Sequence, residues 1–330
     1  MCTVLTYRAD DLYYGRTLDY ERSFEEAVAV IPRRLPLHFR HMPDSEAHYA
    51  FMGMASTMGK EPLFYDGVNE KGVCAAALRF AASAVYHESK KKGHALASFE
   101  VIPYVLGSCA TLAEVRAALA NISVTGEGYS DELPPSPLHW FFADESGALV
   151  LESTADGVHI HDDPVGVLTN EPPFPEQMRR LSDYRHLSAD PGENRLLPAV
   201  SLPLYTRGTG AIGLPGDLSS PSRFVRAAFT AGNAEAASGT AAVSRCFQIL
   251  DTVRVVRGCC QTEDGSASAT VYAAVCNMSR GIYYCETEEN RTPCAVMLRG
   301  ENLDGNRPIL YSLHRKEQIL WQNENSKEND

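Results

Sequence analysis

Short runs in which apolar residues alternate with polar ones dominate the start of the chain and predict β-structure. CTVLTYR at 2–8 and LYYGRTLDY at 12–20, with the polar turn 9–11 between them, predict a hairpin. EEAVAVIPR at 25–33 and GVCAAALRF at 72–80 predict further strands. The first quarter of the chain is therefore expected to form sheet.

Apolar residues recur at helical spacing in three later segments. The first covers 94–121 with an interruption near Gly107, after which Thr111 is expected to act as an N-cap. In the second, Ser220 stands before Pro221, the residue types favoured at the cap and at the first helical position. A third helix is expected at about 240–253.

Short strands separated by Gly and Asp turns are predicted at 138–172 and again at 271–287. The stretch 187–220 is rich in Pro, Gly and Ser and predicts a long excursion of loops, while the polar tail 323–330 is expected to fray. This order of elements favours a layered α+β domain with helices covering packed sheets. We found no repeat or linker, so 1–330 is interpreted as one domain.

Charge and cysteine usage exclude several classes of protein. The formal net charge of −12 would repel polyanions, which argues against a nucleic-acid or membrane-surface binder. There is no apolar run near 18 residues and no signal-peptide pattern. The nine cysteines are odd in number and lack a C-x-x-C pair, as is typical of reduced thiols in a cytoplasm.

Two motifs suggest cofactor chemistry that their context does not support. The G-x-G-x-x-G pattern starting at Gly208 is followed at once by Pro215, so no helix can open there to bind a dinucleotide. His159 and His161 share one face of a predicted strand, but no third ligand follows at a meaningful spacing. We therefore expect no metal and no organic cofactor.

The second residue carries the most distinctive chemistry. Removal of Met1, which is expected before a small residue, would give Cys2 both a thiol and a free α-amine. An α-amine has a reference pKa of about 7.7–8.0, so part of it is a neutral base near pH 7. A thiol of pKa about 8.5 is only a few per cent thiolate at that pH, and a neighbouring guanidinium raises this fraction.

The predicted hairpin brings charged residues near Cys2. If its turn centres on Asp10–Asp11, Cys2 lies opposite Asp19, whose carboxylate would then either hold the terminal ammonium or orient the amine as a base. Strict alternation then puts Arg16 on the other face, unless the strand is bulged near Gly15. The three residues form a candidate catalytic unit.

Ordered motifs from residue 1 to about 307 resemble the choloylglycine hydrolase family, which includes bile salt hydrolases and penicillin V acylases. They are MCT, YGRTLDYE, DGVNEKG, LHW, VLTNEPPF, GLPGDLSSPSRFVR, RGIYYCET and ENLDGN. The resemblance implies a four-layer αββα sandwich of the N-terminal-nucleophile hydrolase type. It also implies a homotetramer, with a projecting loop at about 187–210 that helps assembly.

The same resemblance implies roles for individual residues. Cys2 would be the nucleophile, Arg16 would lie beside its sulfur, and Asp19 would hold the amine. Asn170 would point its amide into the oxyanion hole, and Arg223 would complete the polar network. Each residue also has an ordinary alternative, for example a turn cap for Asn170 and a solvated cation for Arg223.

One position departs from the family pattern. Where bile salt hydrolases commonly read GLNFP, this chain reads ALRFA, so Arg79 replaces the usual Asn. The backbone N–H of Arg79 would still serve the oxyanion hole. Its side chain would face the substrate, where it favours an anionic amino-acid head group.

The implied activity is hydrolysis of bile salts conjugated to glycine or taurine, through a thioester on the cysteine. Substrate-pocket positions would be Leu18, Phe24, Met58 and Leu138, each of which could equally be ordinary core. A penicillin V or N-acyl-homoserine lactone acylase uses the same catalytic residues. A non-catalytic binding protein that retains Met1 is the alternative from another class, and a cysteine-rich metal module is less favoured.

Overall fold

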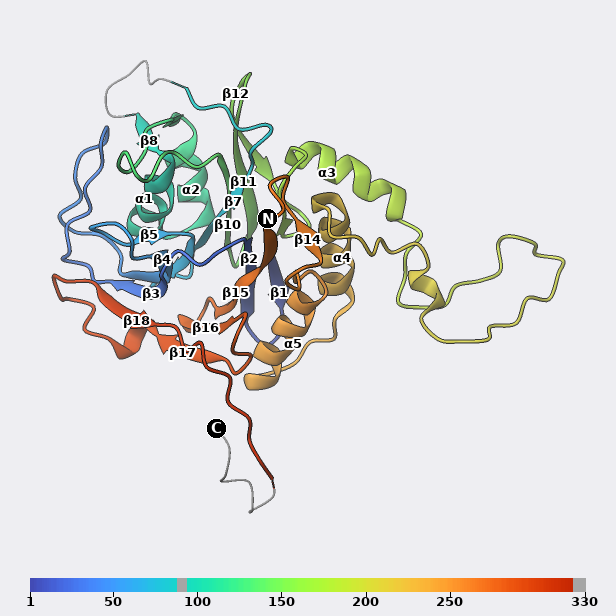
Figure 1. The fold of residues 1–330 in the computed structure, drawn as a ribbon. Coiled ribbons are helices and arrows are strands. Elements are labelled where there is room, and N and C mark those ends of the chain that lie inside the picture. Colours follow the sequence, from blue (N-terminus) through green and yellow to red (C-terminus); the bar gives the residue numbers. More distant parts are fainter. Residues whose placement is uncertain (88–93, 323–330) are drawn as a thin grey trace.

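The computed structural model describes residues 1–87 and 94–322, and two antiparallel sheets face each other at its centre. Helices lie on the outer face of each sheet (Figure 1). The layers therefore run helix, sheet, sheet, helix, and the expected α+β sandwich is confirmed. The tail expected to fray, 323–330, lies outside the described residues.

The first sheet begins with the N-terminal hairpin and has the strand order β13-β1-β2-β15-β16-β17, with β14 paired to β15. Its strands are β1 (Cys2–Arg8), β2 (Leu12–Tyr20), β13 (Val167–Leu168), β14 (Cys260–Gln261), β15 (Ala267–Asn277), β16 (Ile282–Thr287) and β17 (Cys294–Met297). Both faces of this sheet are covered, which explains the nearly continuous burial of β1, β2 and β15.

The second sheet has the order β12-β11-β10-β7-β6-β4-β3-β18, with β5 paired to β4. Its strands are β3 (Glu26–Ile31), β4 (Phe51–Ser56), β5 (Leu63–Phe64), β6 (Asp66–Asn69), β7 (Cys74–Arg79), β10 (Leu138–Asp144), β11 (Gly147–Thr154), β12 (Gly157–Asp162) and β18 (Ile309–Ser312). A separate parallel pair joins β8 (Ala95–Ala97) to β9 (Ser123–Thr125).

The helices pack on the two outer faces. Helices α4 (Ser220–Asn233) and α5 (Thr240–Asp251) cover the first sheet, and α3 (Phe174–Leu181) packs against α4. Helices α1 (Val101–Ser108) and α2 (Leu112–Leu119) cover the second sheet. One cluster of buried side chains fills the space between the sheets and continues under α4 and α5, and another lies beneath α1 and α2.

Two helix predictions need correction. The helical segment is shorter than 94–121, because β8 and a 3₁₀ turn occupy its start. The expected interruption near Gly107 is present between α1 and α2, and Thr111 caps α2 by accepting a hydrogen bond from Glu114 N. The cap of α4 is Ser219, not Ser220. No described helix is long and apolar enough to cross a membrane.

The stretch after α3 leaves the body of the protein as a projecting loop (Figure 1). Apart from the 3₁₀ turn Thr209–Ala211, residues 188–219 form no helix or strand. Its apolar side chains are strongly exposed, notably Leu196, Leu204 and Tyr205. The predicted excursion is present, and its role in assembly stays a prediction.

The N-terminal hairpin has a different register from the predicted one. Its turn is a three-residue loop centred on Asp10, so Cys2 pairs with Leu18, and the prediction that it lies opposite Asp19 is wrong. A shift of one residue exchanges the two faces of a strand. Arg16 consequently shares the face of Cys2 without a bulge, and Asp19 lies on the opposite face.

Candidate active site

The start of β1 lies beside β2, β13 and the first turn of α4. Cys2 is buried, and its backbone N donates to Oδ1 of Asn170 over 3.0 Å. Met1 extends the strand: its ammonium donates to the backbone carbonyl of Asp19 over 2.5 Å, and its own carbonyl accepts from Asp19 N over 2.8 Å. The amine next to Cys2 is thus held by backbone groups while Met1 is present.

Arg223 projects from α4 into this cluster and is fully buried. Its Nη1 donates to the carbonyl of Cys2 over 2.6 Å and to Oγ1 of Thr3 over 2.7 Å. Its Nη2 donates to Oδ1 of Asn170 over 2.6 Å. Burial lowers the pKa of Arg223, and the Asp19 carboxylate, 4.0 Å from Nη1, acts in the opposite direction. Arg223 therefore fixes Cys2 and Asn170 relative to each other and is no solvated cation.

The Asp19 carboxylate lies on the α4 side of the sheet. It accepts hydrogen bonds from Oγ1 of Thr270 over 2.6 Å and from Oγ1 of Thr17 over 3.4 Å. It is fully buried, so these hydroxyl groups and Arg223 supply its nearby polar environment. With Met1 in place, the carbonyl of Asp19 contacts the terminal amine and its carboxylate does not.

Arg16 lies on the other face, between the two sheets. Its Nη1 donates to the carbonyl of Tyr65 over 2.7 Å and pairs with Asp66 at 3.3 Å, with both side chains fully buried. Burial opposes its charge, but Tyr272, Asp66 and Cys2 raise the pKa of Arg16 well above its ordinary value. Its Nε and Nη2 have no hydrogen-bond partner among the described residues. A fixed positive charge therefore stands on the Cys2 side of the sheet.

Asp66 was missed by the sequence analysis, although it begins the quoted motif DGVNEKG. Besides Arg16, it accepts hydrogen bonds from the hydroxyl groups of Tyr272 over 2.6 Å and Tyr283 over 2.7 Å. These contacts join β6 of one sheet to β2, β15 and β16 of the other. The sequence offered one indication of a role for Asp66: its motif belongs to the same ordered set as the motifs that contain the catalytic candidates.

Asn170 is held at three points. Besides the contacts of Oδ1, its Nδ2 donates to the carbonyl of Arg79 over 2.8 Å, and its backbone N donates to Oγ of Ser220 over 2.8 Å. An amide nitrogen carries two hydrogens, and the second is not used by these contacts. Asn170 therefore has an N–H available for a ligand beside the end of β7.

A cavity of about 390 Å³ opens onto Cys2 and Met1. All five residues proposed to bind substrate line it, namely Leu18, Phe24, Met58, Arg79 and Leu138. Further walls come from β5, from the 3₁₀ turn before α1 and from the segment that precedes β10, which the sequence did not single out; they are Leu63, Phe64, Phe99, Tyr129, Leu133 and Pro134–Pro137. The mixture of aromatic and aliphatic walls suits a bulky apolar group.

A second cavity of about 410 Å³ adjoins the first. Both are lined by Met1, Tyr20, Arg22 and Arg79, and Cys260 to Ser268 supply much of the remaining wall of the second. Met1 therefore stands at the boundary of an apolar and a polar cavity.

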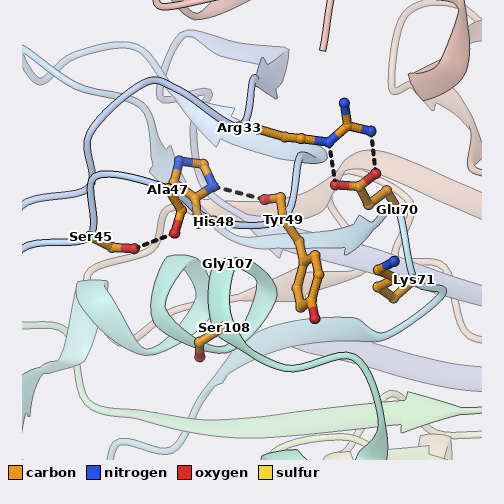
Figure 2. A pocket seen from close by; sticks show the side chains of 9 residues that line it. All are labelled: Arg33, Ser45, Ala47, His48, Tyr49, Glu70, Lys71, Gly107 and Ser108. Carbon is orange, nitrogen blue, oxygen red and sulfur yellow. Dashed lines mark hydrogen bonds and ion pairs between the residues drawn. The ribbon is translucent and has the colours of Figure 1, made fainter. Parts of the chain in front are cut away.

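A larger groove of about 670 Å³ lies elsewhere, around Arg33, His48 and Lys71 (Figure 2). Several of its polar groups are already engaged within the protein: Arg33 forms two hydrogen bonds to Glu70, and the ring of His48 contacts two backbone carbonyls. No cysteine lines it, whereas the first cavity reaches Cys2, which makes the Cys2 cavity the candidate active site. Within the described residues, no group of three or more His, Cys, Asp or Glu could hold a metal ion.

Comparison with known proteins gives a consistent family. Residues 2–311 match the family described as linear amide C–N hydrolases, choloylglycine hydrolase family. A bile salt hydrolase/transferase of Lactiplantibacillus plantarum is 41% identical over 96% of this chain and 98% of its own length. The bile salt hydrolase/transferase of Clostridium perfringens is 32% identical over 96% of this chain and 98% of its own length.

Two known structures share the fold. The mutant C2A conjugated bile acid hydrolase of Clostridium perfringens superposes with a TM-score of 0.90 at 30% identity, covering 98% of this chain and 100% of that one. A penicillin V acylase of Agrobacterium tumefaciens superposes with a TM-score of 0.77 at 20% identity, covering 95% of this chain and 92% of that one. At this level of identity the likeness shows the fold alone. The chain therefore belongs to the choloylglycine hydrolase family and is a hydrolase of linear amide C–N bonds.

Proposed function

We propose that this protein hydrolyses the amide bond between a bile acid and glycine or taurine, with Cys2 as the nucleophile once Met1 has been removed. The names of its relatives support the substrate class. The observation that carries the proposal is the position of Cys2: it lines an apolar cavity, and its backbone nitrogen lies 3.0 Å from Oδ1 of Asn170.

In the proposed mechanism, the α-amine of Cys2 takes the thiol proton, directly or through water, and the sulfur attacks the amide carbonyl. The positive charge of Arg16 favours the thiolate. Negative charge then develops on the carbonyl oxygen, where Nδ2 of Asn170 and the backbone N–H of Arg79 act as donors. The amine leaves with a proton from the α-amine, and water cleaves the thioester.

The two cavities match the two parts of such a substrate. The steroid would occupy the apolar cavity, and the carboxylate or sulfonate of the head group would approach Arg79, which is exposed at the boundary with the polar cavity. Met1 lines both cavities, so its removal would free space between them beside Cys2. An amine bound in the polar cavity could also capture the thioester in place of water and form a new conjugate.

We further propose a cytoplasmic homotetramer in which the loop at 187–210 contributes to assembly. Its exposed leucine and tyrosine side chains support an interface there. Light scattering of the protein with and without residues 190–206 tests this proposal. An unchanged number of subunits in the shortened protein would exclude the loop from the interface.

The activity test uses wild-type protein and Cys2→Ser, with removal of Met1 verified by intact mass. Amine release is measured with glycocholate, taurocholate and penicillin V side by side. Release from the bile salts by the wild type alone is expected. Wild-type turnover of penicillin V only would assign the alternative acylase activity, and inert protein free of Met1 would overturn the proposal.

A further inference from the structure

His139 is a fully buried residue of β10 that has no role in the mechanism above. Both of its ring nitrogens face acceptors: Nε2 lies 3.0 Å from the carbonyl oxygen of Thr169, and Nδ1 lies 3.2 Å from Oε1 of Glu152. A carbonyl cannot donate a hydrogen bond, so Nε2 carries a proton. Nδ1 faces the carboxylate of Glu152, so this carboxylate and the carbonyl of Thr169 together fix the orientation of the ring.

Glu152 on β11 is built to remain ionised. Burial acts to raise the pKa of this carboxyl, but its contacts with His139, His161 and the backbone N–H of Phe174 lower it to about 2. The Phe174 N–H donates over 2.9 Å, and Nε2 of His161 lies at 3.6 Å. Glu152 thus links the interior histidine to the start of α3.

His139 contacts two residues that are next in sequence to the two proposed oxyanion donors. Thr169, whose carbonyl it binds, immediately precedes Asn170. Phe80, which immediately follows Arg79, stacks on the imidazole with ring centroids 4.3 Å apart and planes inclined by 5°. One rigid side chain therefore contacts the segment that holds each donor.

A second connection joins these segments. The carboxylate of Glu171 accepts hydrogen bonds from Ala82 N at 2.8 Å, Ser83 N at 3.0 Å and Ser83 Oγ at 2.7 Å. Glu171 is only partly buried, whereas His139 has no exposed surface. The two donor segments are consequently tied together by an accessible carboxylate and by a buried histidine.

We propose that His139, oriented by Glu152, is a positioning residue that sets the placement of the Asn170 amide against the backbone N–H of Arg79. This inference rests on the proposed function, because the two donors act on the oxyanion of that reaction. Donors stabilise the transition state only when they point at the place where charge develops, and a misplacement of about 1 Å costs on the order of 100-fold in rate. The effect of His139 is therefore expected in kcat and not in KM.

A matched pair of variants separates its two contacts. In His139→Gln the amide nitrogen falls near the position of Nε2 and keeps the donor to Thr169. In His139→Asn it falls near Nδ1 and keeps the contact with Glu152. Both variants lose the imidazole ring and keep one amide donor. We nevertheless expect kcat on glycocholate to be about 10-fold or more lower for His139→Asn than for His139→Gln, with KM within about twofold.

Alkylation of Cys2 by iodoacetamide is the control, since that reaction needs no oxyanion donor. Its rate is expected to be equal in the wild type and both variants, and melting temperatures show that both are folded. Equal kcat in the two variants, or a slower alkylation that accounts for the loss of kcat, would overturn the inference.

If both variants unfold, Glu152→Gln decides: full kcat contradicts the inference, and reduced kcat with normal alkylation supports it. A wild type that alkylates but releases no amine overturns the proposed function instead.

Discussion

The backbone nitrogen of Cys2 lies 3.0 Å from Oδ1 of Asn170, although 168 positions separate the two residues in the sequence. The same oxygen accepts a hydrogen bond from the buried guanidinium of Arg223. Two donors therefore fix the oxygen of this amide, and its nitrogen must face Arg79. The orientation that Asn170 needs for its proposed role as an oxyanion donor is therefore imposed before any substrate binds.

Replacing Asn170 should affect rate and stability separately. In Asn170→Ala, kcat is expected to fall about 100-fold or more, as for other lost oxyanion donors. Unfolding should also become easier by about 1–3 kcal/mol, because Arg223 loses a buried partner. Asn170→Asp keeps an oxygen that accepts from Arg223 but has no amide donor. Its kcat should therefore fall as far as that of Asn170→Ala, while its free energy of unfolding, measured by urea denaturation, should fall less. Near-normal kcat in this variant would remove Asn170 from the oxyanion hole.

Arg16 and Asp66 form a fully buried ion pair between the sheets. Arg16→Leu leaves the carboxylate without its cation, so the free energy of unfolding should drop by about 3–5 kcal/mol. Asp66→Asn should be similarly costly, but the double variant should be more stable than the sum of the two losses predicts. Urea denaturation of all four proteins measures this coupling, and strictly additive losses would contradict it.

Arg79 should govern affinity for the head group without affecting the chemical step. In Arg79→Asn the backbone N–H remains, so kcat should stay within about twofold. KM for both conjugates should rise by about 3–10-fold, since one exposed charge-assisted contact is lost. The matched control is Arg22→Gln, because Arg22 lines the same two cavities but lies over the ring of Phe24. A fall in kcat with unchanged KM would indicate that Arg79 acts on the transition state.

Asp163, just after β12, should make the protein less stable as pH rises. Its Oδ1 accepts hydrogen bonds from the N–H groups of Val165 and Gly166, whereas Oδ2 has no partner among the described residues. Burial raises the pKa of Asp163 to about 7, from an ordinary value of 3.8.

The sign of the effect follows from that difference. Because the unfolded chain gives up this proton at a lower pH, stability from the group is complete below pH 3.8 and is lost as pH rises through about 7. The loss amounts to at most about 4 kcal/mol. Asp163→Asn should therefore gain stability relative to the wild type between pH 4 and pH 8 in urea denaturation. A constant difference would show that the carboxyl titrates normally.

The layer architecture could be predicted from the sequence, because strand and helix periodicities occur in long blocks. The face of each hairpin residue could not. The polar turn around Asp10 contains no glycine to indicate a two-residue loop, and a third loop residue changes which side chains share a face. In the observed register Arg16 needs no bulge near Gly15 to share the face of Cys2, and the register shift beside this strand lies in β15, between Thr270 and Tyr272.

The supporting residues were harder to predict than the candidates themselves. Ser220 has the sequence of a helix cap, yet its hydroxyl binds Asn170. Asp66, His139 and Glu152 meet their partners only across sheets or strands, so no local spacing reveals them. Local sequence pattern identifies the groups that suit a reaction, but the contacts that orient those groups depend on tertiary packing.

The distance in sequence between Cys2, Asn170 and Arg223 also orders events in time. A ribosome that adds about 5–20 residues per second makes Cys2 first and reaches Arg223 more than about 10 s later. During that interval the proposed nucleophile exists without its amide donor and without the guanidinium that fixes the strand. The nascent chain thus carries a thiol that cannot yet use the completed site, and hydrolytic competence arises only when the last of these segments has folded.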